Sequence, residues 1–111
     1  MKSDIKNKEG CEIPRWQIIK ATLNNLNYLD FLEASCSDPN GVVLDVRTSP
    51  EYIEDHLPNA INLNYLSQTL ADDLESLIQK KNYYVYCRTG RRSLRVCLLM
   101  KNMGFNVYNL D

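Results

Sequence analysis

The sequence lacks the features that mark metalloproteins, secreted proteins and membrane proteins. It has one histidine and four cysteines, at positions 11, 36, 87 and 97, without a C-x-x-C pair or another zinc-ligand spacing. No apolar run approaches the ~20 residues that cross a bilayer. The N-terminus MKSDIKNKEG lacks the apolar segment of a secretion signal. We therefore expect no metal, no membrane partner and a cytoplasmic protein with reduced thiols.

Neither sign of charge is in excess. The 111 residues include 13 basic and 14 acidic side chains, and the formal net charge of −1 gives no reason to expect a nucleic-acid partner. The positive charge is instead concentrated in one segment, between Arg88 and Arg95. With 44% hydrophobic residues, the chain has enough apolar side chains for the core of one domain.

Short apolar strands alternate with segments of helical periodicity, which predicts an α/β layer fold with a mostly parallel sheet. We expect residues 1–14 to form a polar N-terminal tail and residues 15–111 to form the domain. Strands are predicted near 16–19, 42–46, 60–63, 83–86 and 105–110. Helices are predicted near 22–34, 67–80 and 93–103, with a brief one that starts at Thr48 or Ser49. Ligands of such sheets bind beyond the carboxyl ends of the strands.

One predicted strand end combines a cysteine with several cations. The strand Tyr83–Tyr86 is followed by Cys87, Arg88, Thr89, Gly90, Arg91 and Arg92, and a helix begins near Ser93. Backbone N–H groups converge at a helix N-terminus and favour an anion there, and cations beside a thiol favour its thiolate form. Cys87 is therefore either a reactive or anion-binding residue, or a buried cysteine that fills a strand end. The arginines favour the first interpretation, because a core cysteine needs no cations.

Three blocks of the sequence resemble the rhodanese-like (sulfurtransferase) domains. VVLDVRTSPEYIEDHLPNAINLNY, residues 42–65, is similar to the family's strand D-V-R, its short acidic helix and its G-H-I-P-G-A-x-N-I turn. YYVYCRTGRRS, residues 83–93, is similar to the strand and C-R-x-G-x-R-S loop, and GFNVYNLD, residues 104–111, to the segment G-F/Y-x-N-V-Y-x-L-x-G-G. The resemblance implies the rhodanese-like three-layer fold, a central sheet flanked by helices.

The resemblance also implies a sulfurtransferase that needs no cofactor. Cys87 would take a sulfane sulfur from a small anionic donor such as thiosulfate, hold it as a persulfide and pass it to a thiophilic acceptor, a thiol or a protein. The loop would bind the donor and the sulfur through backbone N–H groups and side chains. These residues are Arg88, Thr89, Gly90, Arg91, Arg92 and Ser93. Guanidinium groups suit oxyanions, and Gly90 permits a left-handed backbone. Structural alternatives are a solvated Arg91 and a Ser93 that caps the helix.

Four further residues are expected to support the site without reacting: Asp45, Arg47, Glu51 and His56. Asp45 lies inside an apolar strand, where a carboxylate is costly unless paired, and we favour Arg92 as its partner. Arg47 and Glu51 are expected to form a second ion pair. His56 lies in the turn that the family uses structurally, and an ionised thiolate needs no general base.

The sequence departs from the family pattern at two places. Asp55 and Asn59 replace the usual glycines of the turn, and both residue types tolerate left-handed conformations. The family typically continues with G-G-I-x-x-W and a closing helix, whereas this sequence stops at Asp111, so we expect the final family helix to be absent or truncated.

Three other functions compete with sulfur transfer. Phosphatases of related fold need C-x-x-x-x-x-R, but here arginine is the fifth residue after the cysteine and Ser93 is the sixth, so the loop is one residue short. A non-catalytic interaction or regulatory module often loses the cysteine, which this chain retains. A redox-sensing thiol needs a resolving cysteine. Cys97 lies on the apolar face of the predicted helix, and Cys11 and Cys36 have no local feature that suggests chemistry.

Overall fold

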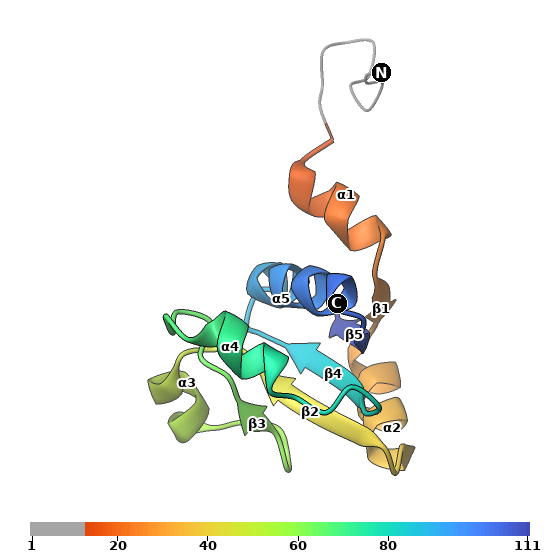
Figure 1. The fold of residues 1–111 in the computed structure, drawn as a ribbon. Helices are drawn as coiled ribbons and strands as arrows, with labels where there is room; N and C mark the ends of the chain where they lie inside the picture. Colours follow the sequence, from red (N-terminus) through yellow and green to blue (C-terminus); the bar gives the residue numbers. More distant parts are fainter. Residues whose placement is uncertain (1–12) are drawn as a thin grey trace.

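The computed structural model describes residues 13–111, which build a parallel sheet with helices on both faces (Figure 1). The strands are β1 (Asn24–Leu26), β2 (Gly41–Asp45), β3 (Ile61–Asn62), β4 (Asn82–Tyr86) and β5 (Asn106–Leu110), in the order β1-β5-β4-β2-β3. The helices are α1 (Arg15–Ala21), α2 (Tyr28–Ser37), α3 (Ser49–Glu54), α4 (Leu70–Glu75) and α5 (Arg91–Asn102). The predicted α/β fold is confirmed. Nearly all of the predicted N-terminal tail, residues 1–12, lies outside the described residues.

All strand pairs are parallel, so the carboxyl ends of the strands meet at one edge of the sheet. Asp45 at the end of β2 is in register with Tyr86 at the end of β4, and Val85 is in register with Asn109 of β5. Cys87 follows β4 directly. The topology therefore brings a carboxylate, a phenol, an amide and the candidate cysteine to the same edge.

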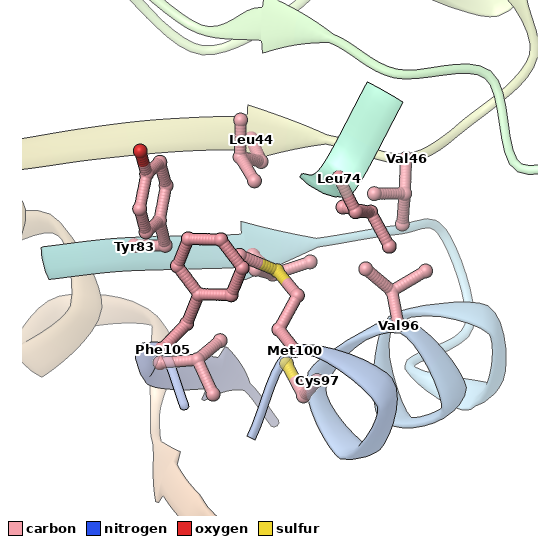
Figure 2. Close-up of a cluster of buried hydrophobic side chains, with 10 residues drawn as sticks. Leu44, Val46, Leu74, Tyr83, Val96, Cys97, Met100 and Phe105 are labelled. Carbon is pink, nitrogen blue, oxygen red and sulfur yellow. The ribbon is translucent and has the colours of Figure 1, made fainter. Parts of the chain in front are cut away.

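The central strand β4 separates two apolar clusters, because successive side chains of a strand point to opposite faces. Tyr83 and Val85 face α4 and α5, where Cys97 and Met100 of α5 pack among them with Phe105 (Figure 2). The other side chains of β4, Tyr84 and Tyr86, pack against Phe31 of α2 on the opposite face. Burial on both faces explains the continuous apolar run in the β4 sequence.

The first part of the described chain differs from its prediction. Residues 16–19 form part of helix α1 and not a strand, and the helix predicted over 22–34 is replaced by β1 followed by α2. The asparagines explain the second difference: Asn25 lies in β1, and the Asn27 side chain caps α2 by accepting from the Asp30 N–H at 2.9 Å. Asparagine favours caps and turns over helix interiors, because its side chain competes for backbone groups.

The helix predicted over 67–80 is shorter, and α4 covers only Leu70–Glu75. Serine side chains bond to nearby backbone at both ends: Ser67 Oγ accepts from the Thr69 N–H at 3.1 Å, and Ser76 Oγ donates to the Asp73 carbonyl at 2.7 Å. Such local bonds offer the backbone an alternative to further helical turns. None of the helices in residues 13–111 has the length and apolar content needed to cross a bilayer.

At the amino ends of the strands, Asp38 links the segment before β2 to β4 through hydrogen bonds. Its carboxylate accepts hydrogen bonds from the Asn82 side chain at 2.9 Å, the Asn40 N–H at 2.8 Å and the Tyr84 hydroxyl at 2.9 Å. These three bonds hold the pKa of Asp38 below its ordinary value, because they favour the charged form. One ionised carboxylate therefore holds the amino ends of β2 and β4 together, at the end of the sheet away from Cys87.

Candidate active site

The Cys87 sulfur lies at the amino end of α5, in contact with two backbone amides. The Gly90 N–H donates to Cys87 Sγ at 3.0 Å and the Ser93 N–H donates at 3.3 Å. Gly90 has φ +80°, the left-handed conformation that the sequence allowed for, and it lets the loop curl around the sulfur. Thr89 is exposed, and its hydroxyl accepts from the Arg91 N–H at 3.5 Å instead of contacting the sulfur. Cys87 is only half-buried, so its sulfur is not sealed in the core.

Behind the sulfur, three polar side chains form a hydrogen-bonded chain across the sheet edge. Ser93 Oγ donates to Asn109 Oδ1 at 2.6 Å, and Asn109 Nδ2 donates to Asn25 Oδ1 at 3.1 Å. Asn25 Nδ2 in turn donates to the carbonyls of Lys20 at 2.8 Å and Leu23 at 3.2 Å. Carbonyl oxygens only accept, so they fix the direction of the whole chain: every member donates toward the end of α1.

This direction decides what Ser93 offers to the sulfur. The Ser93 hydroxyl donates to Asn109 Oδ1 at 2.6 Å and has the Gly90 carbonyl as a second acceptor at 3.2 Å, so its oxygen lone pairs face Cys87 Sγ at 3.5 Å and accept from the thiol. The sequence-based alternatives, a hydroxyl donor to the sulfur or a helix cap, are both wrong for this arrangement, because the cap position of α5 is Gly90. Stabilisation of a negative sulfur is therefore provided by the two amides.

Asp45 is fully buried and is paired with Arg47, not with Arg92 as the sequence predicted. Arg47 Nη2 donates to Asp45 Oδ2 at 2.8 Å, and the Arg47 N–H donates to Asp45 Oδ1 at 2.8 Å. The Tyr86 hydroxyl donates to Oδ2 at 2.8 Å. The hydrogen bond to Asp45 raises the pKa of Arg47, and burial raises the pKa of Tyr86 to about 12, so the guanidinium stays charged and the phenol stays protonated.

Glu51, and not Asp45, is the carboxylate close to the loop arginines. It caps α3 by accepting from the Thr48 N–H at 3.0 Å and the Thr48 hydroxyl at 2.8 Å. Its oxygens lie 3.5 Å from Arg88 Nη1 and 4.0 Å from Arg92 Nη1. The Thr48 bonds and then the nearby guanidinium charges lower the pKa of Glu51. The predicted Arg47–Glu51 ion pair is replaced by these contacts.

A hollow of about 130 Å³ opens between Glu51 and the Cys87 loop. Its lining includes the guanidinium groups of Arg47, Arg88 and Arg92, together with Thr89. The charge of Arg47 is balanced by Asp45, so Arg88 and Arg92 face one carboxylate, Glu51, and leave an excess of positive charge next to the amides that contact the sulfur. The arrangement suits a small oxyanion, since guanidinium groups bind such anions through paired N–H donors.

The remaining loop arginine points to the other side. The Arg91 guanidinium carbon lies 3.8 Å from the centre of the Trp16 ring, so the first helix is in contact with the Cys87 loop. A cation over an aromatic face is an attractive contact. Arg91 is thus neither merely solvated nor directed at the Glu51 hollow.

Comparison with known proteins identifies the family of this fold. The family model for the rhodanese-like domain matches residues 29–111, most of the chain. The chain belongs to the rhodanese-like family. A rhodanese-related protein of Thermoplasma volcanium has a similar structure, with a TM-score of 0.70 and 27% identity over 79% of this chain and 83% of that one.

Two relatives of this rhodanese-like domain carry sulfurtransferase names. A tRNA sulfurtransferase of Thermoplasma acidophilum is 33% identical over 62% of this chain, but the match spans only 13% of that longer protein. YtwF of Bacillus subtilis, named as a candidate sulfurtransferase, is 29% identical over 68% of this chain and 71% of its own length. The family is thus one of rhodanese-type sulfurtransferases.

In this rhodanese-like domain the single histidine supports the turn before β3. The His56 ring stacks on Tyr52 with centroids 3.8 Å apart, and its Nδ1 lies 2.8 Å from the Tyr52 carbonyl oxygen. Asn59 has φ +62°, so it does replace a glycine in a left-handed position. Asp55 has φ −164°, which is extended backbone that any residue adopts. Only one of the two substituted glycine positions therefore needs a left-handed conformation.

The other described cysteines are far less available than Cys87 or lie away from it. Cys97 is fully buried in the core, as the sequence predicted, and burial raises the pKa of its thiol, with a smaller contribution from nearby Cys87. Cys36 is exposed on α2. Cys11 lies outside the described residues.

Sequence reasoning missed four residues that shape the site: Trp16, Asn25, Tyr86 and Asn109. Asn109 carried a usable signal, because it lies two residues after Val107 and so shares the buried face of β5. A polar residue at a buried strand position must have a partner, which is the argument that selected Asp45. Trp16 and Tyr86 carried no such signal, since an aromatic residue in an apolar segment is normally core.

Proposed function

We propose that the protein is a sulfurtransferase that carries sulfane sulfur as a persulfide on Cys87. The single observation that supports this most is the pair of amides, Gly90 N–H and Ser93 N–H, that donate to a half-buried sulfur. Both the thiolate and the persulfide are anions, and preorganised N–H donors stabilise an anion without reorganisation during the reaction. The chemistry needs a reduced thiol, the state that the cytoplasm maintains.

The first half-reaction loads the sulfur. The Cys87 thiolate attacks the outer sulfur of thiosulfate, the S–S bond of the donor breaks, and sulfite leaves with the electron pair. Cys87 then carries one additional sulfur with the negative charge on that outer atom. Arg88 and Arg92, which line the hollow beside Glu51, attract the donor and hold its oxygens. In the second half-reaction a thiophilic acceptor attacks the outer sulfur and restores the Cys87 thiolate.

Intact mass spectrometry tests the loading step directly. After incubation with thiosulfate the protein should gain the mass of one sulfur, and addition of cyanide should remove it. Cys87→Ala should show no gain. Cys36→Ala is the matched control, because Cys36 is exposed but lies on α2 away from the loop, and it should retain the gain. Absence of an adduct with thiosulfate and with polysulfide would refute the proposal.

A second experiment assigns the arginines. Arg88→Gln and Arg92→Gln should each raise the KM for thiosulfate by roughly threefold to tenfold, since a charge-assisted contact to an anion is worth about 1 kcal/mol or slightly more. The kcat of a loaded enzyme should change less. An aryl phosphate should not be hydrolysed by any of these proteins, because the loop is one residue shorter than a phosphatase loop.

A further inference from the structure

Glu51 places a fixed negative charge in the wall of the hollow that lies beside the Cys87 loop. Its carboxylate accepts from the Thr48 N–H at 3.0 Å and from the Thr48 hydroxyl at 2.8 Å, as part of the capping box of α3. Rotation of the Glu51 side chain would therefore uncap the helix. The same bonds lower the pKa of Glu51, so the carboxylate is ionised at neutral pH.

The arginines that face Glu51 are held less firmly. The Arg88 side chain is 79% exposed and the Arg92 side chain is 43% exposed, and their nearest nitrogens lie 3.5 Å and 4.0 Å from the Glu51 oxygens. Ion pairs of this length and exposure contribute little to stability, so the two guanidinium groups can turn to a bound anion. Glu51 stays in place when they do. An anion in the hollow is therefore close to two cations and one carboxylate.

The hollow consequently balances a single negative charge. Two guanidinium groups and the Glu51 carboxylate leave one positive charge. Arg47 adds none, because Asp45 balances it, and the Arg91 guanidinium lies over Trp16, outside the lining of the hollow. A dianion such as thiosulfate brings a second charge that these groups leave unbalanced, which is unfavourable in a site partly removed from water.

We propose that Glu51 selects the sulfur donor by its charge, and that it favours singly charged sulfane-sulfur donors over doubly charged ones. This proposal rests on the proposed function. A Coulomb energy is proportional to the product of the two charges, so Glu51 repels a dianion twice as strongly as it repels a monoanion at the same position. Glu51 thus weakens the binding of every anionic donor, and that of a dianion most. It takes no part in making or breaking bonds.

Thiosulfate and methanethiosulfonate are a matched pair of donors, because a methyl group replaces one oxygen and removes one charge. They have the same number of non-hydrogen atoms and the same outer sulfur. With either donor the Cys87 thiolate attacks the outer sulfur, and the S–S bond of the donor breaks. The electron pair leaves on sulfite from thiosulfate and on methanesulfinate from methanethiosulfonate, so no oxidant or reductant is consumed. The intrinsic reactivity of each donor cancels when a variant is compared with the wild type.

Glu51→Gln removes the charge and keeps the helix cap, since the side-chain oxygen of glutamine also accepts from Thr48. At low ionic strength, kcat/KM for formation of the Cys87 persulfide should rise about twofold with methanethiosulfonate and about fourfold with thiosulfate, because the repulsion removed is twice as large. Intact mass spectrometry against time gives both values. Equal rises for the two donors, or no larger rise for thiosulfate, would overturn the proposal.

Glu54→Gln is the matched control. It removes the same charge from the same helix, at an exposed position outside the lining of the hollow. The ratio of the two kcat/KM values should remain that of the wild type. A change in this ratio as large as that caused by Glu51→Gln would assign the selectivity to the general charge of α3 and overturn the role of Glu51.

Unreactive anions test the same charge without catalysis. Sulfate and methanesulfonate differ by one charge, as the two donors do, but have no sulfur to transfer. The NMR chemical shift of the Gly90 amide, which contacts the Cys87 sulfur, reports their binding. Glu51→Gln should increase the affinity for sulfate about fourfold and that for methanesulfonate about twofold.

The two proposals fail in distinguishable ways. If neither donor forms a persulfide while the affinity for sulfate shows the larger gain, the sulfurtransferase mechanism is refuted, and the donor role of Glu51 is refuted with it. If the persulfide forms but Glu51→Gln leaves the ratios for donors and for unreactive anions unchanged, the role of Glu51 is refuted and the sulfurtransferase mechanism stands.

Discussion

Replacement of Asp45 by asparagine should destabilise the domain strongly, because it breaks a buried ion pair while preserving the shape of the side chain. The Asp45 side chain is 0% exposed and accepts from the Arg47 guanidinium, the Arg47 N–H and the Tyr86 hydroxyl. Removal of one partner from a buried pair costs about 3–5 kcal/mol. Arg47 keeps its contacts with Asp55, so we expect about 3 kcal/mol, the lower end of that range. For a domain of this size that corresponds to a fall in Tm of roughly 12 to 24 °C.

Asp55→Asn is the matched control, because Asp55 contacts the same guanidinium at 3.6 Å but its side chain is 83% exposed. An exposed pair contributes about 1 kcal/mol or less. Arg92→Ala should also cost about 1 kcal/mol or less, since Arg92 lies at the surface, 4.0 Å from Glu51. Urea denaturation followed by circular dichroism gives the three free energies of unfolding. If the free energies of unfolding of Asp45→Asn and Asp55→Asn differed by less than about 1 kcal/mol, burial would not explain the contribution of the Asp45–Arg47 pair.

Other predictions concern pH, thiol reactivity and the polar chain. The hydrogen bonds that lower the pKa of Asp38 stabilise the fold above the ordinary carboxyl pKa near 4, and this contribution is lost as pH falls through the lower folded-state pKa. Asp38→Asn should therefore be less stable than wild type at pH 7, and the difference should shrink as pH falls below about 4; a difference that does not change with pH would contradict this. Iodoacetamide at pH 8 should label Cys87 in the native protein and Cys97 only after unfolding, because Cys97 is buried and its pKa is raised. Peptide mass mapping identifies the labelled residue. Labelling of Cys97 in the native protein would contradict its burial. Asn109→Leu removes one acceptor of the Ser93 hydroxyl but leaves the Gly90 carbonyl, 3.2 Å from Ser93 Oγ, so alkylation of Cys87 at pH 7 should stay within about twofold of the wild-type rate. A larger increase would show that the hydroxyl turns to the sulfur.

The Cys87 loop could be predicted from the sequence because its chemistry lies in contiguous residues. A strand, a cysteine, a glycine and a helix in this order fix where the amides converge, and the left-handed Gly90 follows from the same segment. The three-layer fold was equally accessible, since the apolar run of β4 is buried on both faces.

The ion pairs could not be predicted because several charged groups meet at one sheet edge. Asp45 and Glu51 can each reach an arginine from the loop or from the end of β2, and only the side-chain directions decide between these pairings. Asp45 pairs with Arg47, which follows it by two residues, whereas Glu51 lies on α3 and faces the loop arginines. Sequence spacing carries no information on that choice.

The first described segment was mispredicted for a different reason. Trp16 and Ile19 fit a short strand as well as a short helix, because a run of a few apolar residues has no distinctive period. Their structure is decided by packing of α1 against α5, which lies far away in the sequence.

The family match begins at residue 29, yet the sheet does not end there. Strand β1, Asn24–Leu26, lies outside the match and shields the free backbone of β5, with Asn24 opposite Tyr108 and Leu26 opposite Leu110. A recombinant fragment limited to the matched residues would leave β5 as an unpaired edge strand, which can form hydrogen bonds with other molecules. It would also remove Asn25, whose side chain accepts a hydrogen bond from Asn109. Work on this protein should therefore retain the segment before residue 29, since solubility and the geometry behind the reactive sulfur both depend on it.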